Sequence, residues 1–141
     1  MSFNAPDIVK LAERLLTEIE VAVRRFPRYH KYQQGAVLRR KAMLVAELAH
    51  KAWRERGAVA RVAELVDAVD NLRIAMQLSQ RIHAYASFKQ FEALARIQTE
   101  LGRRCGGWLN ARRGNGQNAP ARRQGQRAQI LSPRAALGAN A

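Results

Sequence analysis

The sequence predicts an all-α protein: an antiparallel up-down four-helix bundle over residues 1–113, followed by a disordered Arg-rich tail over 114–141. Three observations predict this fold class. Apolar residues recur at steps of three or four along four stretches of twenty-odd residues, which places them on one face of a helix. The connections between these stretches are short, as between antiparallel neighbours. The apolar fraction of 48% is mainly Ala, Leu and Val, which favours helices over a sandwich or barrel.

The first helix is expected over about residues 6–25. Asn4 can cap it, and Pro6 and Asp7 suit a first helical turn. Phe26-Pro27 ends it, because proline disfavours the helical conformation of the residue before it. The side chains expected to face inward are Ile8, Leu11, Leu15, Ile19 and Ala22.

The second and third helices are expected over about 33–56 and 59–82, with Gly57 between them as a natural terminator. The inward residues of the second are Leu38, Ala42, Val45, Leu48 and Ala52, and those of the third are Val62, Leu65, Val66, Val69, Leu72 and Met76. Val37, Leu44 and Trp53 widen the apolar surface of the second helix beyond what one neighbour covers. Such a surface suggests a second contact, for example with another subunit.

The fourth helix is expected over 87–113, starting at a capping box formed by Ser87 and Gln90. Its inward residues are Phe91, Leu94, Ile97, Leu101, Cys105 and Trp108. The glycines at 102, 106 and 107 are tolerable where another backbone or the Trp108 ring approaches closely. The stretch 114–141 is rich in Gly, Asn, Gln, Pro and Arg. It contains too few large apolar residues to offset the entropy of ordering, so we expect a disordered basic tail.

The charge of the chain indicates a polyanionic partner. It has 25 Lys and Arg against 11 Asp and Glu, a net charge of +14, and no acidic residue follows Glu100. Such an excess favours nucleic acid over a merely soluble basic surface. No RRM, KH or zinc-knuckle pattern is present, so recognition of backbone and shape is expected. The candidate nucleic-acid-binding residues are Arg24, Arg25, Arg28, Lys31, Arg39, Arg40, Lys41, Arg103, Arg104, Arg112 and Arg113.

The topology predicts where these residues gather. In an antiparallel bundle, the turn after the first helix lies at the same end as the turn before the fourth. The C-terminus of the fourth helix lies at the opposite end. Two basic regions are therefore expected, one at each end or along the long sides of the bundle. Arg can bind phosphate in a bidentate manner, which suits it to this role.

Several features bear on the cellular compartment. Cys105 is the single cysteine, so no intrachain disulfide can form, which fits a reducing compartment. The N-terminus has no basic region followed by an apolar run, so no secretory signal is expected. No apolar run approaches the roughly 20 residues of a membrane span. We expect a cytoplasmic protein without a membrane partner.

Motifs with catalytic or metal-binding chemistry are weak. Glu47 and His50 have the Glu-x-x-His spacing of a di-iron half-site, but that site needs a second such pair, which neither His30 nor His83 completes. Cys105 has no histidine nearby in sequence to activate it. The glycines of the last helix form no phosphate loop, because no strand precedes them and no Gly-Lys-Ser/Thr follows. We expect no enzyme, cofactor or metal; a di-metal bundle enzyme is the least favoured hypothesis.

Two stretches, 26–52 and 91–109, carry a family resemblance. Phe-Pro follows the first helix, Leu38-Arg39-Arg40 lies in the second, and Gly-x-x-x-Gly-Gly-Trp ends at Trp108. Their order and spacing resemble the accessory variability determinants of diversity-generating retroelements. The same superfamily includes proteins encoded in intervening sequences of bacterial 23S rRNA genes. The resemblance covers about residues 8–112 and leaves out the tail.

The resemblance implies a fold, partners and an assembly. By this resemblance, the protein would assemble into a pentameric barrel in which each subunit is a four-helix bundle. Members bind the retroelement's reverse transcriptase and its template-repeat RNA, and they support RNA-primed, mutagenic cDNA synthesis without being catalytic. The intervening-sequence branch usually has acidic residues after Phe-Pro, whereas Tyr29, His30 and Lys31 follow closely here. This difference favours the retroelement branch. The alternative is a structural RNA-binding protein of the intervening-sequence type.

Overall fold

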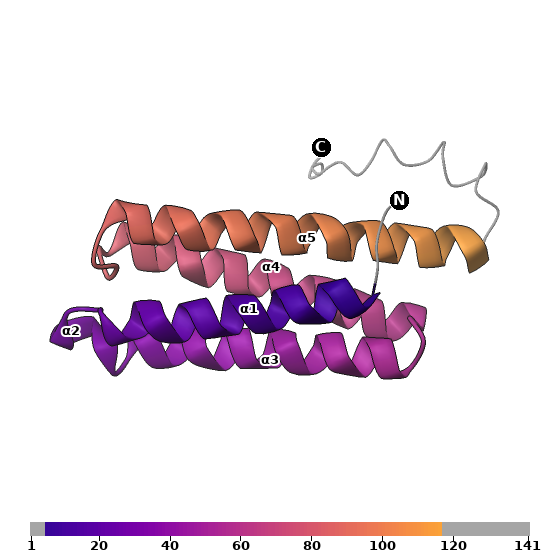
Figure 1. The fold of residues 1–141 in the computed structure, drawn as a ribbon, viewed down its shortest axis with the longest axis horizontal. Helices are drawn as coiled ribbons and strands as arrows, with labels where there is room; N and C mark the ends of the chain where they lie inside the picture. The colour runs from indigo at the N-terminus through magenta and orange to yellow at the C-terminus, as the bar shows by residue number, and fades with distance from the viewer. Residues whose placement is uncertain (1–4, 117–141) are drawn as a thin grey trace, which may run out of the picture. The chain divides into compact units, whose positions relative to one another are not determined.

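The structure, a computed structural model, describes residues 5–116 and is all-helical over that range. Its helices are α1 (Ala5–Arg24), α2 (Arg28–Lys31), α3 (Gln34–Arg54), α4 (Val59–Arg81) and α5 (Phe88–Gly116), shown in Figure 1. The four expected long helices are present, with ends within three residues of the expected positions. Asn4 and the tail from residue 117 lie outside the described residues. None of the described helices is both long and apolar enough to cross a bilayer.

The chain divides into two units, Met1–Leu109 and Asn110–Ala141, and the first contains the core. All four long helices contribute to this core. Leu15, Leu38, Leu72 and Leu101, one from each, are completely buried. Each such side chain contributes about 1.5–3 kcal/mol by leaving water. Most of the inward residues expected from the sequence are buried. Those that lie half-buried at the edge of the core are Leu11, Leu48, Val66 and Phe91.

Polar bonds and one close approach fix neighbouring helices against each other. A Cβ added at Gly35 of α3 would lie 2.6 Å from Cγ1 of Val23, so glycine allows α3 to approach α1 there. Gln34 Nε2 donates a 2.6 Å hydrogen bond to Ser79 Oγ, which joins α3 to α4. The buried Gln98 of α5 donates through Nε2 to a carbonyl oxygen of α4 at 3.4 Å. Since unpaired buried amides are costly, these bonds also specify which helices are neighbours.

The ends of α3 and α4 have the same geometry. The second residue after each helix is left-handed, Arg56 with φ 58° and His83 with φ 59°. In both places, the N–H groups of that residue and of the next one bond back to carbonyls of the last turn, as in a Schellman motif. Gly57, expected as the terminator of its helix, adopts φ 72° one residue after Arg56.

The start of α5 contains the expected cap. Ser87 Oγ accepts a 3.1 Å bond from the Gln90 N–H, and Gln90 Oε1 in return accepts a 3.3 Å bond from the Ala86 N–H. A Cβ at Gly102 would meet only ordinary contacts, and one at Gly106 or at the next glycine would meet nothing within 4 Å. Close packing therefore does not require these three glycines.

Candidate nucleic-acid interface

Two segments without acidic residues come together at one end of the first unit. Between Glu20 and Glu47 the chain has seven basic residues and no acidic one, and between Asp70 and Glu92 it has three basic residues and no acidic one. The first segment contains α2, and the second contains the α4–α5 connection; Figure 1 draws both at the same end. We call residues 24–41 and 81–89 the basic end.

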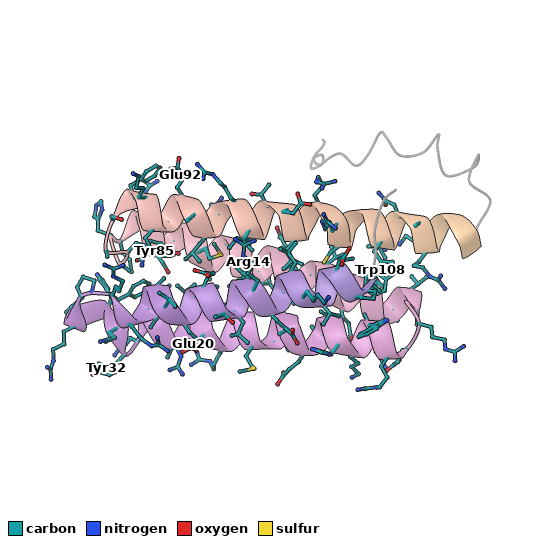
Figure 2. The ribbon with its side chains drawn as sticks, in the orientation of Figure 1. Arg14, Glu20, Tyr32, Tyr85, Glu92 and Trp108 are labelled. Carbon is teal, nitrogen blue, oxygen red and sulfur yellow. The ribbon has the colours of Figure 1, made fainter. Side chains whose placement is uncertain are left out.

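An aromatic cluster holds the basic end together from inside. The rings of Phe26 and Tyr85 meet edge to face, with centroids 5.3 Å apart, and Tyr85 also contacts Phe91 at 5.3 Å. The Tyr85 hydroxyl donates to the carbonyl oxygen of Met76 at 3.0 Å. Burial raises the pKa of Tyr85 above its ordinary value, so the phenol stays neutral. Figure 2 shows this side chain between the helices. The α1–α2 link is thereby tied to the α4–α5 link.

Seven of the candidate binding residues lie at the basic end. Arg24 lies at the end of α1 and Arg25 just after it, two more lie in α2, and three follow within α3. Arg39 Nε donates to Glu20 Oε2 at 2.7 Å and is therefore neutralised within the protein. The other six make no ion pair with any described residue and are fully or partly exposed: Arg24, Arg25, Arg28, Lys31, Arg40 and Lys41.

The remaining four candidates lie elsewhere. Arg103 and Arg104 both bind Glu100 Oε2, at 2.6 and 2.5 Å. Hydrogen bonds from Arg104 and then Arg103 lower the pKa of the Glu100 carboxyl, which keeps it ionised. Arg112 and Arg113 belong to the second unit. The structure therefore brings together seven of the eleven candidates.

The α3–α4 connection has a different electrostatic character. From Glu47 to Asp70 there are five acidic and four basic residues, which nearly cancel. Arg61 bonds to Glu55 at 3.0 Å and to Glu64 at 3.1 Å. The hydrogen bond that Arg61 donates to Glu55 is the main reason that the pKa of Arg61 is raised. Arg61 is thus neutralised locally, whereas Lys51, Arg54 and Arg56 make no ion pair with a described residue but lie in a segment whose charges nearly cancel.

The residues considered for metal or nucleophilic chemistry have structural contacts. His50 Nε2 lies 2.6 Å from Glu13 Oε2, so the imidazole of the Glu-x-x-His pair meets a carboxylate of α1. Among residues 5–116, no group of three or more His, Cys, Asp or Glu could hold a metal ion. Burial raises the pKa of Cys105 to about 12, so its nucleophilic thiolate form is suppressed.

The sequence reasoning missed the aromatic residues of this surface. Tyr29, Tyr32 and Phe88 are the most exposed large apolar side chains of the described residues, at 87%, 71% and 60%. Figure 2 shows Tyr32 at the edge of the molecule, pointing away from the helices. The alternation Arg-Tyr-His-Lys-Tyr is a usable signal for an exposed aromatic surface; the stretch was expected to be a turn, whereas its first four residues form α2.

Two hollows border the basic end. One, of about 520 Å³, is lined by Tyr29, His30, Gln33, Gln34 and Ile82. The other, of about 560 Å³, runs between α3 and α4, and its apolar lining includes the exposed side chains of Ile74 and Leu78. Both volumes are in the range of ordinary ligand sites.

Comparison of the chain with models of protein families, with curated proteins and with solved structures finds no match. The family resemblance therefore depends on the quoted residues alone.

Proposed function

We propose that this protein is a non-catalytic, nucleic-acid-binding accessory subunit of a diversity-generating retroelement reverse transcriptase. It would bind the polymerase and its template-repeat RNA and support RNA-primed mutagenic cDNA synthesis. The observation that carries the proposal is the basic end, where eight exposed or half-exposed Lys and Arg side chains lack an acidic partner among the described residues. Concentrated positive charge without internal neutralisation favours a polyanionic partner.

The proposal includes an antiparallel up-down four-helix bundle as its framework. Support comes from the short links between long helices, from the shared core, and from the bonds that join α3 to α4 and α4 to α5. In such a bundle, the α1–α3 and α4–α5 links meet at one end. The framework would therefore present both acid-free segments to the same ligand.

Phosphate binding is the mechanism that these residues support. Arg24, Arg25 and Arg28 can each bind a phosphate oxygen pair, and Lys31 can add a point charge. Each phosphate contact releases condensed counterions, so affinity should fall steeply with salt. Holding the template backbone in this way would position the priming site relative to the polymerase, while the chemistry stays with the polymerase.

The proposed assembly is a homo-oligomer, a pentamer by family resemblance. Leu44 and Trp53 of α3 are each 46% exposed, and Leu78 of α4 is 57% exposed. Several exposed apolar side chains on neighbouring helices favour coverage by another protein surface. That surface would be a second copy of this chain or the polymerase.

The test is recovery of the tagged protein from its native host with and without nuclease, followed by mass spectrometry. A reverse transcriptase that remains bound after nuclease treatment is the expected result, because the proposal includes a direct protein contact. Ribosomal proteins alone, lost on nuclease treatment, would contradict it and support the 23S rRNA intervening-sequence alternative.

A further inference from the structure

The basic end presents aromatic rings among its cations, an arrangement that phosphate binding does not require. Tyr29 lies in α2, and Tyr32, three residues further on, is the C-cap of α2 with helical φ and ψ, so their side chains lie on adjoining positions of one turn. Arg28 and Lys31 precede them directly. Exposed rings at 87% and 71% gain nothing from burial, so their stabilising role within the chain is small.

The composition around the two tyrosines favours nucleic acid over a protein partner. From Arg28 to Gln34 the sequence is Arg-Tyr-His-Lys-Tyr-Gln-Gln, without an aliphatic side chain. Tyr and Arg also occur at protein interfaces, but there they surround a desolvated apolar core from which Lys is depleted, and this stretch contains Lys31 and no aliphatic side chain for such a core. Rings, cations and amides instead match the three parts of a nucleotide chain: base faces, phosphates and base edges.

The hollow beside Tyr29 is a candidate binding site for a base. Its lining joins the Tyr29 ring and the His30 imidazole to the Gln33 amide, with Ile82 as an apolar contact. The rings of Tyr29 and His30 meet edge to face with centroids 5.0 Å apart, which leaves ring faces open. Gln34 is already bonded to Ser79, so Gln33 is the amide available to a base edge.

We infer that the basic end binds single-stranded RNA, with bases stacked on Tyr29 and Tyr32 while the neighbouring cations hold the phosphates. This inference depends on the proposed nucleic-acid function and specifies its ligand. A duplex keeps its bases stacked on one another, so it can use the cations of this surface and not the rings. Preference for unpaired RNA therefore comes from α2.

The test measures the affinity of the full chain for a labelled oligouridylate and for an RNA duplex of the same length. The variant Tyr29→Ala/Tyr32→Ala removes both rings and no charge. Stacking on an aromatic side chain gives about fivefold or more in affinity per base. Because two rings are removed, we expect a loss of about 25-fold or more on oligouridylate and an unchanged affinity for the duplex.

The matched control is Tyr29→Phe/Tyr32→Phe, which keeps the rings and should retain wild-type affinity for both ligands. Unchanged circular dichroism would confirm that the variants fold, as expected for exposed positions. Equal losses on both ligands, or no loss on oligouridylate, would overturn the stacking role while leaving phosphate binding intact. A wild-type chain that binds neither RNA would refute the proposed function, and the stacking inference with it.

Discussion

The basic end and the α3–α4 connection are built alike and differ in charge. At each, a long helix closes with a Schellman motif around a left-handed residue, His83 in one and Arg56 in the other. At the α3–α4 connection, Arg61 is held by two glutamates. At the basic end, one arginine, Arg39, reaches a glutamate, and eight other Lys and Arg side chains pair with no described residue. Arginine content alone therefore does not identify a binding surface; the placement of acidic residues does.

The closeness of helix packing also differs between the basic end and the middle of α5. Gly35 lies at the basic end, where an added Cβ would be 2.6 Å from Val23 Cγ1, whereas one at Gly102 would lie 3.8 Å from Val69 Cγ1. Overpacking lowers the free energy of unfolding by about 1–3 kcal/mol. Replacing a helical glycine by alanine raises it by about 1 kcal/mol. Gly35→Ala should therefore lower the free energy of unfolding, and Gly102→Ala should raise it. Urea denaturation measures both, and shifts in the same direction would contradict the close approach.

Removing acids from the α3–α4 connection should reduce the difference in charge between the two regions. Glu55→Gln/Glu64→Gln frees Arg61, so affinity for oligouridylate at low salt should rise, by about threefold or less for one added phosphate contact. The control Glu18→Gln/Asp67→Asn changes the net charge equally but leaves Arg61 paired, because these exposed acids have no ion pair among the described residues. It should have the smaller effect. Equal gains would mean that net charge alone determines binding.

The long helices could be predicted from sequence, because each buries one face in a common core and therefore has apolar residues at helical spacing. The stripe from Leu94 to Trp108 is buried as expected, and Ser87 caps its helix. The short helix α2 could not be predicted in this way. It follows Pro27 and contributes no buried residue, so its sequence has no apolar periodicity from which a helix could be predicted.

The candidate site was predictable as a set of residues and not as a surface. Sequence analysis placed Arg39, Arg103 and Arg104 with the binding residues, but each is held by a carboxylate. Those pairs depend on side-chain geometry, even when the partner is three or four residues away. The exposure of Tyr29 and Tyr32 depends on how α2 sits on the core. The polymerase partner and the pentamer stay predictions from resemblance.

The measurement that tests the central claim most directly is the salt dependence of RNA affinity for two charge-reversed variants. One is Arg24→Glu/Arg25→Glu/Arg28→Glu, at the basic end. The other is Lys51→Glu/Arg54→Glu/Arg56→Glu, at the α3–α4 connection, with the same change in net charge. Each lost contact to single-stranded phosphate lowers the slope of log affinity against log salt by about 0.7.

We expect the basic-end variant to lose about 2 units of slope and at least about tenfold in affinity at moderate salt. The α3–α4 variant should lose less than half as much slope, because its cations lie among acids. Thermal unfolding of both variants provides the folding control. Equal losses of slope in the two folded variants would contradict the claim that one end of this protein is its polyanion-binding surface.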